Sequence, residues 1–526
     1  MRSLFLNARI LTMNPENPEA EAIAVGDGRL LAVGSKRMAE SAAGSDAVTY
    51  DLGGKTVVPG LIDSYLHLVG YGHSLQSIDL REAKSIGEIK KAVGSRAKSA
   101  PPGEVISGRG WDQEKLSEGR YPNRLDLDEV APRNPALLSR VCGHIICANS
   151  RALELAHIDA KTPDPPGGEI VREGESGEPN GLLKETAGEI AWSALVQRSH
   201  QQDLETAELA CAELAKVGLT AVHFMSATWP DVEALASLRD EGKLQIRVRL
   251  YVAGEDLGKT RAGLREDDML RVCGVKVLVD GSLGGRTAYL SKPYSDDPST
   301  KGMETIDEGK AERLFESVHR VGLQLAVHSI GDEATKRALD MIERVIKRHP
   351  RSDHRHRIEH ASVLTGTLIK RMGDLGLVAS VQPHFIVTDF WAVKRVGVDR
   401  AKGVYAFRSL RDAGIVTAAG SDCPVEPPSP LLGMKAAVTR GEEKGIELSR
   451  VTPGEKLEPI EALEMYTKAG AYASHEEGLS GSLRAGGFAD FVVLSGDPTT
   501  CVPTDLDRIE VDMTVVNGKV VYSRTK

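Results

Sequence analysis

Runs of β-branched and aliphatic residues alternate with amphipathic segments through the middle of this chain. Helical periodicity, with apolar residues three and four positions apart, covers Glu205–Val217, Glu308–Val321 and Glu333–Lys347. The apolar runs between such segments predict strands at Val57–Ile62, Leu219–Phe224, Gln245–Val252, Gly274–Asp280, Leu323–His328, His356–His360, Leu377–Gln382 and Ile415–Ser421. Strands that alternate with helices indicate βα units around a parallel sheet. Eight such units close a barrel, so we predict an α/β fold with a (β/α)8 TIM barrel.

The two ends of the chain have a different pattern, with short strand-like runs separated by turns. Asp27-Gly28 and Gly53-Gly54 break the N-terminal runs, and Asn517-Gly518 is a strong hairpin signal near the C-terminus. Two all-β ends around a long middle predict one β-sandwich domain built from both termini. We expect its parts at residues 1–56 and 471–526, with the barrel domain at residues 57–470.

A long insertion separates the first two predicted barrel strands. It is about 150 residues long, far beyond a normal connection between such elements. It contains strand-like runs of its own at Glu104–Gly108 and Ala136–Cys142, and a loop rich in proline and glycine at Thr162–Gly168. We place this insertion at about residues 75–215. Because it follows the C-terminal end of a strand, it is expected to cover the mouth of the barrel and shape the pocket.

Composition and charge narrow the class of protein. The net charge is −9, from 66 basic and 75 acidic residues, and this argues against a general nucleic-acid binder. No apolar run reaches the roughly 20 residues that span a membrane, and Met1–Arg9 alternates like a strand, unlike a signal peptide. The six cysteines are scattered without metal-knuckle spacing. A reduced, cytoplasmic enzyme that acts on a small molecule is the simplest interpretation.

Residues able to bind metal or move protons stand at the ends of the predicted strands, where barrel enzymes keep their catalytic groups. His328 and His360 end two of the runs, and Asp422 follows the eighth. A histidine at a strand end is also a common structural residue, so each of them has both interpretations. Lys276 is harder to explain structurally, because burying an unpaired ammonium group costs several kcal/mol. It must be paired, neutral or chemically modified, and Asp280 lies on the same strand face.

Four other histidines receive weaker assignments. His223 and His384 also lie at strand ends; the first fits a structural role and the second a pocket wall. His354 and His356 belong to the charged run Arg351–Arg357, which is typical of a solvated face.

A series of short motifs runs in order along nearly the whole chain. They are Pro59-Gly60-Leu61-Ile62-Asp63-Ser64, Gly110-Trp111-Asp112-Gln113, Gly274-Val275-Lys276, Asp280–Ala288, His328–Asp332, Arg357–Ala361, Gln382-Pro383-His384, Gly420–Val425, Gly481-Ser482-Leu483 and Ala489-Asp490-Phe491. This series resembles the amidohydrolase superfamily, most closely the branch of N-substituted formamide deformylases and YtcJ-like hydrolases. The resemblance implies a TIM-barrel hydrolase with a metal centre.

The resemblance also implies roles for individual residues. It places metal ligands at His67, Lys276, His328, His360 and Asp422, with Lys276 carboxylated and Asp422 moving the proton. Asp280 is the alternative ligand if Lys276 is unmodified. The first-strand histidine pair of the family falls on Tyr65 and His67. Tyrosine is a poor zinc ligand unless ionised, which is unfavourable for a phenol with a pKa of about 10. One metal position is therefore expected to bind weakly, and the other to hold one Zn²⁺ or another divalent ion per chain.

Further residues are implied around the reacting group. Tyr65 is expected to hydrogen-bond the attacking water or the substrate, or only to fill the space left by the missing histidine. Substrate contacts are expected from Trp111, Arg140, His144 and Arg286, which lie in motifs shared with this branch, and from His384 at the pocket wall.

Together these features predict a metal-dependent amidohydrolase that hydrolyses a non-peptide C–N bond of an amide or N-acyl amine. Two alternatives stay open. One is a catalytically silent protein that kept the fold for binding or regulation. The other is a deaminase or an ester (lactone) hydrolase, although Lys276 weighs against deamination. The sequence leaves the substrate and formation of a homo-oligomer undecided.

Overall fold

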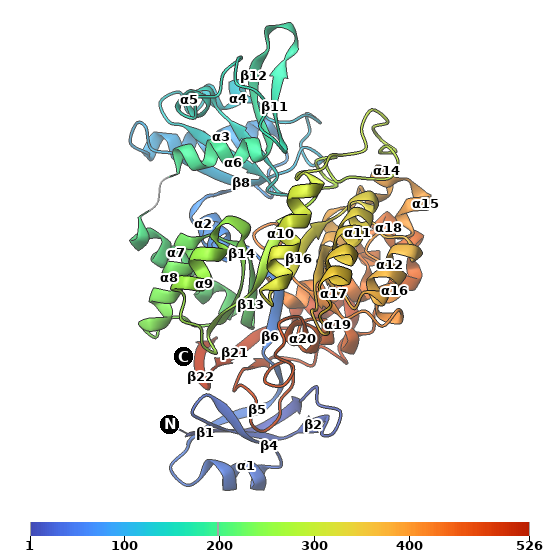
Figure 1. Cartoon of the computed structure of the whole chain (residues 1–526). Coiled ribbons are helices and arrows are strands. Elements are labelled where there is room, and N and C mark those ends of the chain that lie inside the picture. The colour runs from blue at the N-terminus through green and yellow to red at the C-terminus, as the bar shows by residue number, and fades with distance from the viewer. Residues whose placement is uncertain (1, 197–198, 525–526) are drawn as a thin grey trace.

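The computed structural model describes residues 2–196 and 199–524, and its largest part is a barrel of eight parallel strands (Figure 1). In spatial order these strands are β6 (Leu61–Leu66), β13 (Leu219–Ala227), β14 (Arg247–Ala253), β15 (Leu270–Leu278), β16 (Gln324–Ser329), β17 (Arg357–His360), β18 (Val378–Val381) and β19 (Thr417–Ala419). A parallel bridge between Leu66 and Cys423 joins the first strand to the segment after the last. The predicted TIM barrel is confirmed.

Amphipathic helices cover the outside of the barrel. Asp307 begins α10 (Glu308–Arg320) by accepting a hydrogen bond from the backbone N–H of Lys310, as an N-cap aspartate does. Ala311 and Phe315 of this helix face the core, because residues four apart lie on one side. The other main helices are α7 (His200–Lys216), α8 (Trp229–Asp240), α9 (Leu257–Gly263), α11 (Asp332–Arg348), α12 (Gly366–Asp374), α16 (Phe407–Asp412), α17 (Pro430–Thr439), α19 (Pro459–Met465) and α20 (Lys468–Ala473). Within the described part of the chain, no helix combines the length and apolar character needed to cross a membrane.

The first barrel strand starts later than the hydrophobic pattern predicts. The run Val57–Ile62 is divided between two sheets: its first residues belong to β5 (Val48–Pro59), and β6 begins at Leu61. Gly60 lies at the junction, and a Cβ atom there would stand 2.1 Å from the hydroxyl oxygen of Thr220. The close approach of the second barrel strand therefore requires glycine at this point. One continuous apolar run can serve two sheets, and periodicity alone does not reveal the division.

Strands from both ends of the chain form one sheet in the order β22-β21-β20-β5-β1-β3-β4, with β2 beside β1. Their bounds are β1 (Arg2–Leu11), β2 (Glu19–Ala20), β3 (Ala22–Gly26), β4 (Arg29–Gly34), β20 (Phe491–Leu494), β21 (Val511–Val516) and β22 (Lys519–Ser523). The two ends meet where β5 pairs antiparallel with β20. Phe5 and Phe491 pack edge to face there, in a core separate from that of the barrel. The predicted β-domain built from both termini is confirmed.

The insertion after the first barrel strand forms a third sheet, in the order β11-β12-β10-β9-β8-β7. Its strands are β7 (Ile78–Asp79), β8 (Ile106–Trp111), β9 (Ala136–Arg140), β10 (Ile145–Ala148), β11 (Gly168–Glu173) and β12 (Glu178–Glu185), and its helices are α3 (Ile86–Ser99), α4 (Arg124–Asp128), α5 (Ser150–Leu155) and α6 (Thr186–Leu195). Helix α2 (Leu68–Gln76) leads into it from the barrel. Figure 1 shows this unit at the top of the molecule, with the terminal sheet at the opposite end. It has apolar clusters of its own, so it folds around its own core.

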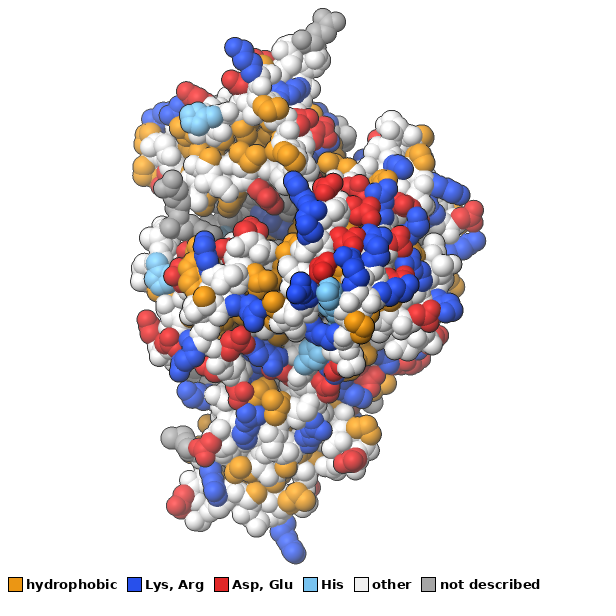
Figure 2. Space-filling model, viewed as in Figure 1, with side chains coloured by type: hydrophobic (Ala, Val, Ile, Leu, Met, Phe, Trp, Pro, Cys, Tyr) orange, Lys and Arg blue, Asp and Glu red, His pale blue; other side chains and the backbone are white. Residues whose placement is uncertain are grey.

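Ion pairs cover the outer face formed by α10 and α11, where acidic and basic side chains alternate (Figure 2). Arg344 lies 2.7 Å from carboxylate oxygens of Glu308 and Glu312, and Arg348 pairs with Glu312 and Glu316. The arginine side chains are nearly half exposed. Exposed pairs of this kind contribute about 0–1 kcal/mol each, so this face adds little to stability.

The prediction of a solvated face for His354 and His356 is wrong. Both side chains are buried, and their rings stack with centroids 4.5 Å apart. Nε2 of His356 lies 2.7 Å from Nδ1 of His319, and Nδ1 of His356 accepts the backbone N–H of Leu325. Burial lowers the pKa of His354 to about 4 and that of His356 well below its usual value. These histidines are neutral packing residues that tie β17 to β16 and α10.

Candidate active site

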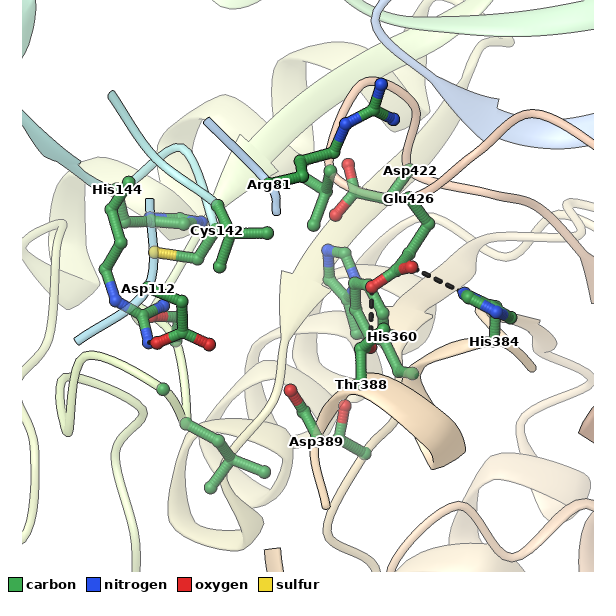
Figure 3. A pocket seen from close by; sticks show the side chains of 18 of the residues that line it. Arg81, Asp112, Cys142, His144, His360, His384, Thr388, Asp389, Asp422 and Glu426 are labelled. Carbon is green, nitrogen blue, oxygen red and sulfur yellow. Dashed lines mark hydrogen bonds and ion pairs between the residues drawn. The ribbon is translucent and has the colours of Figure 1, made fainter. Parts of the chain in front are cut away.

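A cavity of about 290 Å³ lies where the insertion meets the C-terminal ends of the barrel strands (Figure 3). His328, His360 and Asp422 line it from the barrel, and Arg140 and His144 line it from the insertion. The three barrel residues reach the cavity because they stand at or just beyond the ends of β16, β17 and β19. The structure thus brings residues far apart in the sequence into one space.

His328 and His360 present their rings side by side, with centroids 4.4 Å apart. Nε2 of His328 lies 3.1 Å from the carbonyl oxygen of Gly281, and Nδ1 of His360 lies 2.7 Å from Oε1 of Gln382. Both partners are acceptors, so these nitrogens carry the hydrogens and lone pairs remain on Nδ1 of His328 and Nε2 of His360. Burial lowers the pKa of His360 to about 3 and that of His328 well below its usual value. Both rings are therefore neutral, as metal binding requires.

Lys276 and Tyr65 meet inside the barrel beside these rings. Nζ of Lys276 donates to the Tyr65 hydroxyl at 2.5 Å, and Nε2 of His360 lies 3.2 Å from the same oxygen. The Tyr65 ring packs among apolar side chains of the barrel interior. Burial raises the pKa of Tyr65 well above its usual value and lowers the pKa of Lys276 to about 8. Tyr65 is thus a neutral phenol, and much of Lys276 is an uncharged amine in mildly alkaline solution.

Asp422 and His67 come together where the barrel closes. The backbone N–H of Asp422 donates to the carbonyl of Tyr65, and that of His67 donates to the carbonyl of Cys423. These bonds leave Nε2 of His67 3.4 Å from Oδ1 of Asp422. Burial acts to raise the pKa of Asp422, but the hydrogen bond from His67 holds it below its usual value. The carboxylate is therefore ionised at neutral pH and can act as a base.

Asp63 fixes the position of Asp422 from behind the cavity. Its carboxylate accepts the hydroxyl of Ser421 at 2.5 Å, the backbone N–H of Ser421 at 3.1 Å and the backbone N–H of Tyr65 at 3.0 Å. Burial raises the pKa of Asp63 to about 7. Asp422 itself has a φ of 57°, in the left-handed region that few residues other than glycine adopt. The contacts of its neighbours hold this strained backbone in place.

The donor set fits a divalent metal ion if Lys276 is modified. Among the residues that the structure describes, no group of three or more His, Cys, Asp or Glu side chains is arranged to hold a metal ion. His328 and His360 supply two neutral imidazoles whose outer nitrogens are hydrogen-bonded, as those of metal-binding histidines usually are. A carboxylated Lys276 would add an anionic oxygen beside them. An unmodified, protonated Lys276 would instead repel a cation.

Asp280, the alternative ligand, already has other partners. Its carboxylate accepts the backbone N–H groups of Tyr289, Ile330 and Gly331 at 2.9, 3.0 and 2.8 Å. Oδ1 of Asp280 also lies 3.6 Å from Nε2 of His328, which is the ring nitrogen that carries the hydrogen. Burial raises the pKa of Asp280 to about 7. It therefore supports His328 from outside the cavity.

The residues expected to contact substrate have different surroundings. Trp111 is fully buried in the insertion, where its indole N–H donates to a backbone carbonyl at 2.8 Å, and it does not line the cavity. Arg286 also lies away from the cavity and donates to Asp296 at 2.9 Å. Arg140 does line the cavity, but its guanidinium is bonded to Asp112 at 2.7 Å.

His144 and His384 line the cavity, and each is bonded to a carboxylate; Figure 3 shows the contact of His384 with Glu426. Nδ1 of His144 lies 2.6 Å from Glu185, and Nδ1 of His384 lies 2.5 Å from Glu426. Burial acts to lower the pKa of His144, but the charge of Glu185 raises it to about 9. The ring of His144 is therefore a cation at neutral pH, with its centroid 5.5 Å from that of His328.

Comparison with known proteins identifies the family. The sequence profile of the amidohydrolase family matches residues 48–522. The chain belongs to the amidohydrolase family. YtcJ of Bacillus subtilis (strain 168) is 35% identical over 534 residues, with 100% of both chains covered. The N-substituted formamide deformylase of Arthrobacter pascens is 31% identical over 544 residues, covering 100% of this chain and 99% of that protein.

A solved structure agrees with this assignment. The crystal structure of an uncharacterized metal-dependent hydrolase from Pyrococcus horikoshii OT3 matches with a TM-score of 0.81 and 34% sequence identity. The match covers 96% of this chain and 99% of that chain. The predicted family and the predicted branch are both confirmed.

This amidohydrolase has pocket residues that the sequence did not single out. Phe385, Asp389, Trp391 and Tyr405 line the cavity from the segment that follows β18, and Glu426 lines it from the segment that follows β19. The sequence offered one indication of their role, because residues that follow the C-terminal ends of barrel strands tend to lie at the active site. Their spacing forms no chemical motif, so only the folded chain shows that they share one wall.

Proposed function

We propose that this amidohydrolase hydrolyses a non-peptide C–N bond of a small amide or N-acyl amine with the help of one divalent metal ion per chain. The observation that carries this proposal is the neutral pair His328 and His360 beside the ionised Asp422 in one cavity. A divalent ion, when bound, supplies Lewis acidity that polarises a carbonyl group and makes water more acidic. The names of two relatives, a metal-dependent hydrolase and an N-substituted formamide deformylase, support the same reaction class.

Three residues would hold the metal ion: His328 through Nδ1, His360 through Nε2 and Lys276 through a carbamate oxygen. Imidazole nitrogen and anionic oxygen are ligands that Zn²⁺ accepts, and Mn²⁺, Fe²⁺ and Co²⁺ accept them as well. The carbamate forms when the neutral amine of Lys276 attacks CO₂ and loses a proton, and a pKa of about 8 makes that amine accessible. His67 and Asp422 would form a second, weaker position because Tyr65 stands where a further imidazole is needed.

Proton transfer falls to Asp422. As an ionised carboxylate it accepts a proton from the attacking water and then delivers it to the nitrogen of the leaving amine. The cationic His144 lies across the cavity from His328 and would stabilise negative charge that develops on the carbonyl oxygen. The hydroxyl of Tyr65 adjoins His360 and would hydrogen-bond the water or the substrate.

The proposal is tested by metal quantitation and hydrolysis assays on protein purified with zinc and without chelators. We expect about one ion per chain and cleavage of members of a panel of N-formyl and N-acetyl amines. Asp422→Asn should retain the metal ion and lose activity about a hundredfold or more, whereas His360→Ala should lose both. The matched control is His349→Ala, which removes a surface imidazole paired with Glu316 and should change neither. A wild-type protein that contains no metal and cleaves no amide would overturn the proposal.

The contact between Tyr65 and Lys276 favours a second candidate, a catalytically silent protein with a binding or regulatory role. In this arrangement the phenol oxygen lies 2.5 Å from the lysine nitrogen, and no three His, Cys, Asp or Glu side chains in the described ranges 2–196 and 199–524 form a group able to hold a metal ion. Tyr65→His distinguishes the two. A silent protein gains hydrolysis only in the variant, whereas the proposed enzyme is active beforehand and gains metal content. Aminated heterocycles and lactones in the same panel test deamination and ester hydrolysis.

A further inference from the structure

We infer that one wall of the cavity is an ammonium-binding subsite built around Asp389, so that the substrate carries a protonated amine in addition to its scissile bond. We call this wall the Asp389 subsite; it consists of Asp389, Tyr405, Phe385 and Trp391. The inference rests on the proposed function only in taking this cavity as the place where substrate binds.

Asp389 differs in its partners from Asp112 and Glu426, two other carboxylates that line the cavity. Asp112 is bonded to Arg140 at 2.7 Å, and Glu426 is bonded to His384 at 2.5 Å. Within the described part of the chain, Asp389 has no such cationic partner: its side chain accepts a single hydrogen bond, from the Tyr405 hydroxyl at 2.5 Å. Figure 3 shows its carboxylate directed into the pocket.

The surroundings of Asp389 make a ligand cation favourable. A partly buried carboxylate without a positive partner loses hydration that nothing in the protein replaces, and a cation that enters beside it offsets this cost. Burial raises the pKa of Asp389 to about 7, which records the same cost in the free protein. Arg140 is the nearby protein cation, but Asp112 and Gln113 already hold its guanidinium. A cationic group on the ligand would supply the positive charge that the neighbouring side chains do not provide.

The aromatic members of the subsite suit an ammonium group. The faces of Phe385, Tyr405 and Trp391 carry negative charge density that attracts cations and repels anions. The Phe385 ring links the subsite to the reaction centre, with its centroid 6.3 Å from that of His360 and 6.4 Å from that of Tyr405. The geometry therefore suits a substrate in which a short apolar spacer joins the scissile amide to the ammonium group. Mono-acylated diamines belong to this class.

Calorimetric titration of the metal-loaded enzyme with benzylammonium chloride, benzyl alcohol and benzoate tests the inference without any variant. Benzylammonium should bind about tenfold or more tightly than benzyl alcohol, and benzoate should bind most weakly. Equal affinities, a preference for benzoate, or the absence of saturable benzylammonium binding at millimolar concentration would each overturn the inference.

The variant Asp389→Asn tests the residue itself, because it keeps the size of the side chain and an acceptor for Tyr405. It should weaken benzylammonium binding about tenfold or more and leave benzyl alcohol unchanged. Asp399→Asn is the matched control, since it makes the same change at a side chain that is 98% exposed and lies outside the cavity lining. An Asp389→Asn protein that has wild-type circular dichroism and binds benzylammonium as before would refute the assignment. If this variant fails to fold, the wild-type comparison still decides.

Hydrolysis assays separate this inference from the proposed function. Mono-N-acetylated butanediamine should have a higher kcat/KM than N-pentylacetamide, in which a methyl group replaces the ammonium group. If amides are cleaved without this preference and benzylammonium does not bind, the subsite is refuted and the hydrolase stands. If benzylammonium binds and no amide is cleaved, the subsite stands and the proposed reaction fails.

Discussion

Replacement of Arg357 by methionine should destabilise the barrel strongly, because Arg357 is the centre of a buried polar network. Its Nε atom lies 2.7 Å from Oε1 of Glu359, Nη2 donates to Oε2 at 2.9 Å, and both side chains are fully buried. Nη2 also donates to the carbonyl of Ser64 at 2.6 Å and to the hydroxyl of Ser380 at 2.9 Å. The network thus joins β17 to β6 and β18 across the inside of the barrel.

The magnitude follows from what methionine leaves behind. Glu359 would remain as a buried charge without a partner, and breaking a buried pair in this way costs about 3–5 kcal/mol. The matched control is Arg344→Met on the outside of α11, where the arginine lies 2.7 Å from Glu308 and Glu312 but is 44% exposed. That change should cost about 0–1 kcal/mol, because water replaces the lost partner. The two variants make the same chemical change and differ in burial.

Urea unfolding, followed by far-UV circular dichroism, measures the loss in free energy of unfolding for each of the two variants. The values are taken from the transition in which the barrel unfolds. The double variant Arg357→Met/Glu359→Met should recover much of the loss, because it removes the stranded charge along with the arginine. Two results would refute this reasoning. One is a cost for Arg357→Met within about 1 kcal/mol of that for Arg344→Met. The other is a double variant no more stable than the single one.

Three further predictions follow from the same structure. The thermal midpoint should fall as the pH drops below about 6.5. In that range His354 and His356 bind protons in the unfolded chain but not in the folded protein, where their pKa values are lowered. His356→Gln should make the thermal midpoint depend less on pH. Asp63→Ala should lower kcat about a hundredfold by displacing Asp422, with retained metal content as the check on the ligands. Glu185→Gln should lower the pKa of His144 from about 9, measured by NMR titration of the imidazole protons, because the largest charge that opposes the effect of burial is then removed.

Much of the fold could be predicted from the sequence because the strands of a barrel are buried on both sides. Such strands appear as continuous apolar runs, and the runs ending at His328 and His360 are found where they were predicted. The run Val57–Ile62 was misassigned because it passes from one sheet to another at Gly60 without a change in polarity. His354 and His356 were misassigned because their neighbours in sequence are charged, whereas their neighbours in space are another histidine and a backbone N–H.

The candidate site could be predicted in part, for a related reason. Residues at strand ends, such as Asp422, are placed by the barrel itself, so their order in the sequence predicts their meeting in space. Residues in loops and in the insertion depend on partners that lie far away in the sequence. Arg286 therefore pairs with Asp296, and Asp389 lies in the cavity although no sequence motif marks it.

Tyr65 gives the site a property that phenylalanine would not provide. A phenol hydroxyl can accept a hydrogen bond or donate one, and here it accepts from Nζ of Lys276. Carboxylation would leave one N–H on Nζ and add two carbamate oxygens, which are acceptors to which the same hydroxyl could donate. Phenylalanine would leave the unmodified amine without this partner, at the cost of an unsatisfied buried donor. Tyrosine at this position is therefore compatible with both forms of Lys276, and the supply of CO₂ and metal ion would decide between them.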